Sequence, residues 1–151
     1  MSIARALVAF CVAATLAMPA AHAVDTPGST EAPDLTAVRA KIKAKDFKSA
    51  LVDLDGMIDK GVQHADVYNL LGFSLRKTGD YAKALTFYKK ALDYDADHKG
   101  AHEYLGELYV ETGQVPKARE HLAILERLCP SGCEERDDLA QAIAAAAPKA
   151  R

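Results

Sequence analysis

The sequence predicts an all-α fold in which three helix pairs stack one behind another and a further helix closes the C-terminal end. The apolar residues are mostly Ala and Leu with few β-branched runs, a composition that favours helices. Apolar positions recur every three or four residues, as in Leu85, Tyr88 and Leu92, which is the spacing of one helix face. The chain also matches itself at one constant offset, which indicates repeated structural units.

Residues 1–23 have the features of a secretory signal peptide. Arg5 supplies a positive charge, residues 6–18 form a short apolar run, and Ala21 and Ala23 are the small residues that a signal peptidase recognises. The run is too short to cross a bilayer comfortably, because a spanning helix needs about 20 apolar residues. We therefore expect export with cleavage after Ala23, with the bacterial periplasm as the compartment and no transmembrane segment in the mature chain.

Residues 24–33 are polar and contain two prolines and a glycine, so we expect a flexible leader. The self-match follows this leader. Eight positions of one unit correspond, at the same offset, to eight positions of the next: the first set is Tyr68, Leu71, Gly72, Gly79, Tyr81, Ala84, Tyr88 and Ala91, and the second is His102, Leu105, Gly106, Gly113, Val115, Ala118, Leu122 and Leu125.

This pattern resembles the tetratricopeptide repeat, a unit of about 34 residues that forms two helices, with Leu-Gly in the first helix and Gly at the turn. The resemblance covers residues 31–132, which are about two thirds of the chain. Residues 65–98 match closely, residues 99–132 nearly as well, and residues 31–64 are degenerate because Lys45 replaces the turn Gly. The resemblance implies a right-handed superhelix, with helices near 34–45, 47–60, 66–78, 81–94, 100–112 and 116–128.

Glycines and alanines mark the places where paired helices are expected to approach closely. We expect Gly72 to face Ala84 and Gly106 to face Ala118, because a larger side chain would push the helices apart. Gly79 is expected to end a helix in the left-handed conformation, and Gly113 does the same one repeat later.

Residues 133–147 are expected to cap the stack, because a terminal repeat otherwise exposes its apolar flank. The predicted helix begins at Glu134 with an acidic first turn, which suits the positive end of the helix. Leu139 and Ile143 lie on one face and would cover the third repeat. Residues 148–151 are expected to fray.

The resemblance implies a concave groove that is lined by the first helix of each repeat and binds a polypeptide. Carried onto this chain, the groove would be basic and partly apolar at its start and acidic towards its end, with Phe73 as an apolar anchor. The groove positions are Leu35, Arg39, Ile42, Lys43, Asp66, Asn69, Phe73, Arg76, Lys77, Glu103, Glu107, Val110 and Glu111. The alternative is that these charges form only a solvated helix face. The family's clamp for C-terminal carboxylates is not reproduced by Arg39, Leu70, Gly100 and Tyr104.

Cys129 and Cys133 lie in the sequence Cys-Pro-Ser-Gly-Cys between the third repeat and the cap. In an exported protein we expect them to form a disulfide that staples the cap. Redox exchange through a low-pKa thiol at Cys133 and metal binding remain alternatives, although the spacing is Cys-x3-Cys and no His flanks the pair. His98 and His102, four residues apart, are expected to be core or surface histidines rather than metal ligands.

The formal charge of −2 offers no global basic field for nucleic acid. The sequence contains no phosphate-binding loop and no His-Glu-x2-His motif, so we expect no catalysis, cofactor or metal. It predicts an adaptor of the cell envelope that binds a protein or peptide partner, and it leaves open weak self-association through the degenerate repeat. The alternative function is a thiol-based redox or metal accessory factor that uses the cysteine pair.

Overall fold

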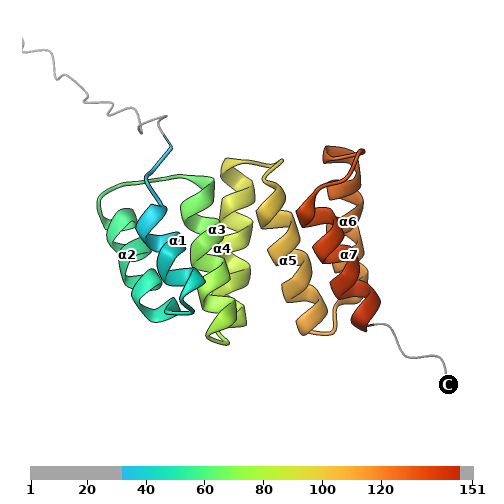
Figure 1. The fold of residues 1–151 in the computed structure, drawn as a ribbon, viewed down its shortest axis with the longest axis horizontal. Helices are drawn as coiled ribbons and strands as arrows, with labels where there is room; N and C mark the ends of the chain where they lie inside the picture. Colours follow the sequence, from blue (N-terminus) through green and yellow to red (C-terminus); the bar gives the residue numbers. More distant parts are fainter. Residues whose placement is uncertain (1–31, 147–151) are drawn as a thin grey trace, which may run out of the picture.

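The computed structural model describes residues 32–146, and within that range it contains seven helices and no strand. The predicted all-α fold is confirmed, and each predicted helix is found within two residues at either end. The predicted signal peptide, most of the leader and the tail at 148–151 lie outside the described residues. The helices are α1 Thr36–Lys43, α2 Phe47–Asp59, α3 Ala65–Lys77, α4 Tyr81–Tyr94, α5 Lys99–Glu111, α6 Val115–Leu128 and α7 Glu134–Ala146 (Figure 1).

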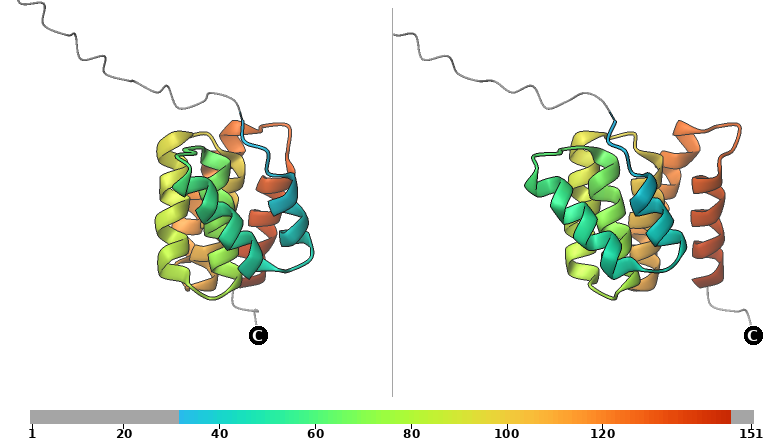
Figure 2. Two further views of the ribbon diagram at one scale, coloured as in Figure 1. Left: turned by 90° about the vertical axis from the view of Figure 1, so that its left-hand side faces the viewer. Right: turned by 60° about the vertical axis from the view of Figure 1, so that its left-hand side comes forward.

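The helices are arranged in two layers (Figure 2). The inner layer consists of α1, α3, α5 and α7, and the outer layer of α2, α4 and α6. Each helix packs against the next along the chain, and α5 also contacts both α3 and α7. The inner layer is therefore continuous from the second repeat to the C-terminal helix.

Polar caps at the helix starts repeat with the same period as the helices. Asp46 and Asp80 lie one repeat length apart, and each side chain accepts a hydrogen bond of 3.2 Å from the backbone N–H three residues later. His64 and His98 are separated by the same length, and their Nδ1 atoms accept bonds of 3.2 Å and 3.0 Å from backbone N–H groups. Each cap satisfies one of the N–H groups that a helix start leaves without a partner.

The turns between paired helices use the left-handed backbone conformation. Gly79 has φ of 88° and Gly113 has φ of 75°, as expected for glycines that end a helix. Lys45 takes the corresponding place in the first pair with φ of 60°, which a residue with a side chain adopts less readily. The degenerate repeat thus keeps the helix pair α1–α2 in spite of the missing glycine.

Two glycines allow close packing, but against side chains other than the predicted alanines. A Cβ atom added to Gly72 would lie 2.6 Å from Cδ1 of Tyr88, and one added to Gly106 would lie 2.5 Å from Cδ2 of Leu139. The side chains nearest to the missing Cβ atoms are therefore those of Tyr88 and Leu139 rather than Ala84 and Ala118.

The α7 helix covers the C-terminal end of the core. Leu139 is fully buried and Ile143 is 8% exposed, and both belong to the cluster that contains Tyr88, Leu105 and Leu125. The capping helix predicted from the sequence is therefore present. None of the helices between residues 32 and 146 combines the length and the apolar character that a bilayer span requires.

Candidate functional site

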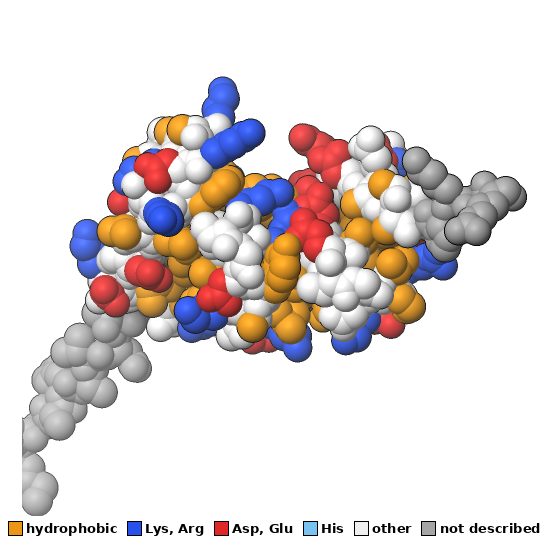
Figure 3. All heavy atoms as spheres, turned by 90° about the horizontal axis from the view of Figure 1, so that it is seen from below, with side chains coloured by type: hydrophobic (Ala, Val, Ile, Leu, Met, Phe, Trp, Pro, Cys, Tyr) orange, Lys and Arg blue, Asp and Glu red, His pale blue; other side chains and the backbone are white. Residues whose placement is uncertain are grey.

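The inner layer forms a hollow face, which we call the concave groove and define as the face formed by α1, α3, α5 and α7. Figure 3 shows Lys and Arg side chains on one side of this hollow and Asp and Glu side chains on the other. Arg39 and Lys43 belong to α1, and Glu134, Glu135 and Asp138 belong to α7. The two walls of the groove therefore carry opposite charge.

The basic wall is open to solvent. The side chain of Arg39 is 56% exposed, and one of its nitrogens lies 3.5 Å from an Asp66 carboxylate oxygen. Lys43 is exposed at the last turn of α1. Both side chains can therefore reach a molecule bound in the groove.

An aromatic strip lies on the floor of the groove. Phe73 is half-buried, and its ring centroid lies 4.8 Å from that of Tyr104. The Phe73 ring also meets Phe47 edge-on at 6.2 Å. The ammonium group of Lys77 lies 5.2 Å from the centroid of the Phe73 ring, a distance at which a cation is attracted to the ring face.

Arg76 is the main correction to the predicted groove. Its side chain is 1% exposed and pairs with the carboxylates of Glu107 and Glu111, the second at 2.9 Å. The guanidinium also lies 5.6 Å and 5.7 Å from the ring centroids of Phe73 and Tyr104. The glutamates that were expected to meet a partner's basic groups are thus engaged by an arginine of their own chain, and Arg76 does not face solvent.

Glu103, which precedes Glu107 by one helical turn, is in a different situation. It is 7% exposed, and its carboxyl group has no hydrogen bond or ion pair with any residue of the described range 32–146. Burial, followed by the nearby carboxylates of Glu107, Asp138 and Glu135, raises the pKa of Glu103 to about 8. At neutral pH its carboxyl group is therefore largely protonated.

A cavity of about 290 Å³ lies beside Glu103, between α3, α5 and the first turns of α7. Asn69 lines it, is 4% exposed, and has an Oδ1 atom without a hydrogen-bond partner in the described part of the chain. The α7 residues Glu134, Glu135 and Asp138 complete the lining. A wider hollow of about 620 Å³ adjoins it, but there the Asp66 carboxylate already contacts His98 at 3.1 Å.

The three acidic residues of α7 were missed as groove residues by the sequence reasoning, which interpreted them as partners of the helix dipole. One feature of the sequence indicates that these residues belong to the inner layer. Leu139 follows Leu105 by one repeat length, so α7 stands where the first helix of a fourth repeat would begin. Residues on its first turns therefore continue the inner layer.

The buried His102 and the half-buried His121 form a pair between α5 and α6, although the sequence offered no companion for His121. The Nε2–H of His102 donates to the Ala96 carbonyl oxygen at 2.9 Å, so its Nδ1 accepts from the Nδ1–H of His121 at 2.8 Å. Burial and the neighbouring His102 lower the pKa of His121 to about 4. Within residues 32–146 no group of three His, Cys, Asp or Glu side chains could hold a metal ion.

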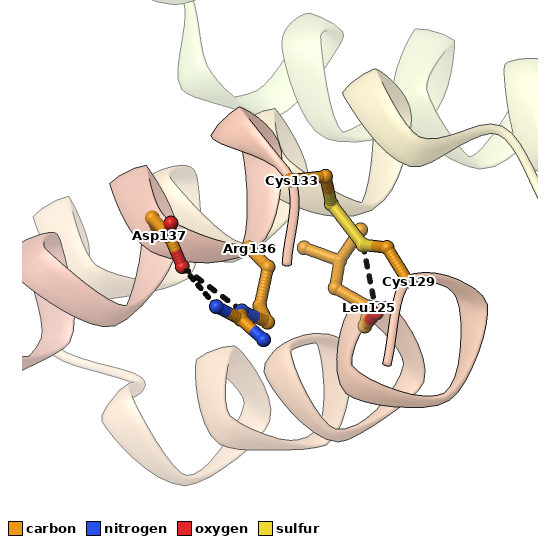
Figure 4. Close-up of a disulfide and its surroundings, with 5 residues drawn as sticks. All are labelled: Leu125, Cys129, Cys133, Arg136 and Asp137. Carbon is orange, nitrogen blue, oxygen red and sulfur yellow. Dashed lines mark hydrogen bonds and ion pairs between the residues drawn. A yellow bond between two sulfur atoms is a disulfide. The ribbon is translucent and has the colours of Figure 1, made fainter. Parts of the chain in front are cut away.

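Cys129 directly follows α6 and Cys133 directly precedes α7 (Figure 4). A disulfide joins them, with Cα atoms 6.0 Å apart, a separation that is usual for this bond. Cys129 is 9% exposed, and Gly132 turns the short loop with φ of 102°. The bond connects the third helix pair to the helix that forms the acidic wall.

Solved structures of similar helical fold include MamA and a type III secretion chaperone. Residues 41 to the end of MamA from Desulfovibrio magneticus RS-1 are similar with a TM-score of 0.58 and 26% identity, and the match covers 62% of this chain and 53% of that one. The chain thus spans about half the length of that MamA chain. The type III secretion translocator chaperone SycD of Yersinia enterocolitica is similar with a TM-score of 0.63 and 13% identity, over 76% of this chain and 90% of that one. The likeness to SycD shows the fold alone.

Comparison with protein families agrees with the repeat described above. Two models of the tetratricopeptide repeat match, one over residues 35–97 and the other over residues 75–127. No curated protein matches the chain. The tetratricopeptide repeat is a protein-interaction scaffold and in general not a catalytic domain. With the helix pairs, their caps and their turns all recurring in one period, the chain belongs to the tetratricopeptide-repeat family.

Proposed function

We propose that the concave groove binds one segment of a partner polypeptide and that the chain acts as an adaptor in the cell envelope. The observation that carries the proposal is the distribution of charge along the groove. Arg39, which is exposed but lies 3.5 Å from Asp66, and the exposed Lys43 belong to α1, whereas Glu135 and Asp138 belong to α7 at the opposite wall. Because the basic wall and the acidic wall carry opposite charge, a segment with charges of both signs can bind in only one direction.

The floor of the groove adds an apolar contact between the two charged walls. Phe73 and Tyr104 are both half-buried, so each keeps part of its ring available to a ligand. A suitable segment places acidic residues against α1, an apolar side chain over Phe73, and a basic residue towards α7. Extended and helical peptides both bind repeat grooves through such spaced anchors.

The envelope location is proposed from the sequence of residues 1–23, which lie outside the described residues. A chain that is exported and cleaved after Ala23 would meet its partner on the far side of the inner membrane. MamA and SycD are similar in fold, and SycD is a chaperone of secretion translocators. A client that is itself an envelope or secreted protein is consistent with that likeness.

We expect the double charge reversal Arg39→Glu/Lys43→Glu to weaken partner binding about tenfold at low salt and less at high salt, because exposed charges contribute modestly and are screened. The partner segment is first identified by photo-crosslinking in cells from a reactive residue at position 43. The crosslinked peptide is sequenced, and a synthetic copy is titrated against the purified chain by fluorescence anisotropy.

The matched control is Lys48→Glu/Lys89→Glu, which makes the same change of charge at exposed positions on α2 and α4. This control should bind the peptide like the wild type. A crosslink from position 89 but none from position 43 would contradict the proposal. So would equal affinity of the two double variants.

We also propose that the Cys129–Cys133 disulfide is a structural staple in the mature protein rather than a redox centre. The supporting observation is that Cys129 is 9% exposed, so of the two sulfurs only that of the half-buried Cys133 is open to an attacking thiolate. We expect reduction to lower the free energy of unfolding by about 2 kcal/mol, the chain-entropy value for so short a loop. Urea unfolding with and without dithiothreitol measures this difference.

The control for the disulfide is the variant Cys129→Ala/Cys133→Ala, whose stability should match that of the reduced wild type and should not respond to dithiothreitol. Alkylation of the untreated protein, followed by mass measurement, reports whether the thiols are free. A bond that opens under glutathione buffers of physiological poise would instead favour the redox alternative.

A further inference from the structure

The cavity of about 290 Å³ between α3, α5 and α7 is lined by two side chains, Glu103 and Asn69, that carry acceptor atoms without partners in the described chain. We call it the acidic pocket and define it by Asn69, Glu103, Glu135 and Asp138. Glu103 is 7% exposed and Asn69 is 4% exposed. Among residues 32–146 the Glu103 carboxyl group forms no hydrogen bond or ion pair but keeps some contact with solvent, whereas the Asn69 Oδ1 atom is fully buried without a partner.

Folding alone does not account for this arrangement. Burying a carboxyl group without a partner destabilises a protein, and burying it beside other carboxylates destabilises it further. Arg76 satisfies Glu107 and Glu111, but it forms no ion pair with Glu103. Groups that destabilise the free fold and face one cavity are candidates for a ligand site.

The chemistry of the lining selects a cation. Five carboxyl groups line the cavity against a single arginine, Arg39, which already lies 3.5 Å from Asp66. The set does not suit a metal ion, since no cluster of three possible ligands in metal-binding geometry occurs among residues 32–146. The volume lies at the small end for ligand pockets, which is right for one side chain and too small for a cofactor.

We propose that the acidic pocket binds one Lys or Arg side chain of the partner segment. This assignment rests on the proposed function, because the pocket opens into the concave groove at its acidic wall. The guanidinium or ammonium group donates to the Glu103 carboxylate on α5 and to Asp138 and Glu135 on α7. The stem of the side chain lies along Leu70, which is 5% exposed and also lines the cavity.

Binding of the cation is coupled to a proton. With its pKa near 8, Glu103 loses its proton when a cation enters at neutral pH, so the affinity rises as the pH passes through about 8. The charged and titratable groups that face Glu103 come from four sides: Arg39 of α1, Asp66 and Arg76 of α3, Glu107 of α5, and Glu134, Glu135 and Asp138 of α7, with His98 in the preceding turn.

The probe is Nα-acetyl-arginine methylamide, and its neutral match is the citrulline analogue, which has the same shape without the charge. The full chain is labelled with ¹³C in the leucine methyl groups, and the Leu70 signals report occupancy of the pocket. We expect saturable shifts with a Kd of about 1 mM for the arginine probe, since one side chain supplies few contacts. The citrulline analogue should leave Leu70 unchanged.

We expect the affinity to be roughly tenfold higher at about pH 9 than at about pH 6.5, because a cation prefers the ionised form of Glu103. The variant Glu103→Gln should bind the probe at least about tenfold more weakly at the higher pH and should lose the pH dependence. Asp138→Asn, at an exposed position, should weaken binding without removing that dependence. Glu126→Gln, exposed on α6 outside the pocket, is the matched control and should bind like the wild type.

Equal shifts with the citrulline analogue, unchanged binding in Glu103→Gln, or displacement of the probe by equimolar Mg²⁺ would overturn the assignment. The two proposals fail separately. If the probe does not reach Leu70 but the crosslinked peptide still distinguishes Arg39→Glu/Lys43→Glu from its control, the pocket assignment alone is wrong. If the probe binds as expected and no peptide crosslinks through the groove, the pocket stands as a cation site and the proposed function is wrong.

Discussion

The substitution Arg76→Ala is expected to lower the free energy of unfolding by about 3 kcal/mol, because it removes a buried guanidinium that pairs with two partly exposed carboxylates and packs against two aromatic rings. The Arg76 side chain is 1% exposed and pairs with both Glu107 and Glu111 on α5. Its loss leaves their two carboxylates close to the buried Glu103 and opens space between the rings of Phe73 and Tyr104. Urea unfolding followed by far-ultraviolet circular dichroism measures the change.

Lys77→Ala is the matched control on the same helix. Lys77 is exposed and its ammonium group lies over the Phe73 ring, so we expect a change within about 0.5 kcal/mol. Equal effects of the two substitutions would show that Arg76 behaves as a solvated groove residue, as the sequence alone suggested. A much larger effect of Arg76→Ala would show that it is part of the core.

Leu139→Ala is expected to destabilise the protein by about 2–5 kcal/mol, the usual range for removing a fully buried leucine side chain. Leu139 is fully buried and packs over Gly106 of α5. Its loss leaves a cavity between α5 and α7 and removes the main apolar contact of the capping helix. Gln141→Ala, exposed on the same helix, is the control and should change stability by less than about 0.5 kcal/mol.

The contact with Gly106 provides a sharper form of the same test. In the wild type, Gly106→Ala should destabilise, because the new Cβ would lie 2.5 Å from Leu139 Cδ2 and 3.1 Å from its Cγ. In the Leu139→Ala background the same substitution should stabilise, because the methyl group fills part of the cavity and Ala favours helix over Gly by about 1 kcal/mol. A change of the same sign in both backgrounds would exclude the direct contact.

The helices and their ends were predictable because their signals are local and repeat. The constant offset between repeats aligns Asp46 with Asp80 at the helix starts and Gly79 with Gly113 at the turns. Each signal acts within a few residues of the backbone that it fixes, so tertiary packing does not override it. Lys45, the one departure from the pattern, adopts the glycine-like conformation because the surrounding pair imposes it.

The burial of Arg76 could not be predicted from its position in the repeat. An arginine at that position can either face solvent or pair with a carboxylate of the next repeat. The outcome depends on which charges α5 presents one repeat later, at separations of 31 and 35 residues. One separation is slightly shorter and the other slightly longer than the repeat length. Opposite charges at about this spacing therefore indicate an ion pair between successive repeats inside the groove. The pairing of His102 with His121 spans 19 residues and follows no repeat, so no pattern in the sequence indicated it.

The acidic pocket was missed because it depends on the placement of α7 rather than on composition. An acidic first turn is expected at any helix start, and the sequence does not tell whether Glu135 and Asp138 face a neighbour or solvent. The packing of the Leu139 side chain over Gly106 determines which residues of α7 face α5. Periodicity predicted the helix α7. Side-chain packing between α5 and α7 determines that the acidic residues of its first turns line the pocket.

The two ends of the groove are attached to the stack unequally, and this gives them different stiffness. α1 packs chiefly against α2 and buries Val38 alone among its own residues, whereas α7 contacts both α5 and α6 and is joined to α6 by the disulfide. Segments with few buried contacts open at lower free energy than those held from several sides. In the proposed function, the acidic end would therefore be the rigid end of the groove, and the basic end would shift to fit segments of different thickness.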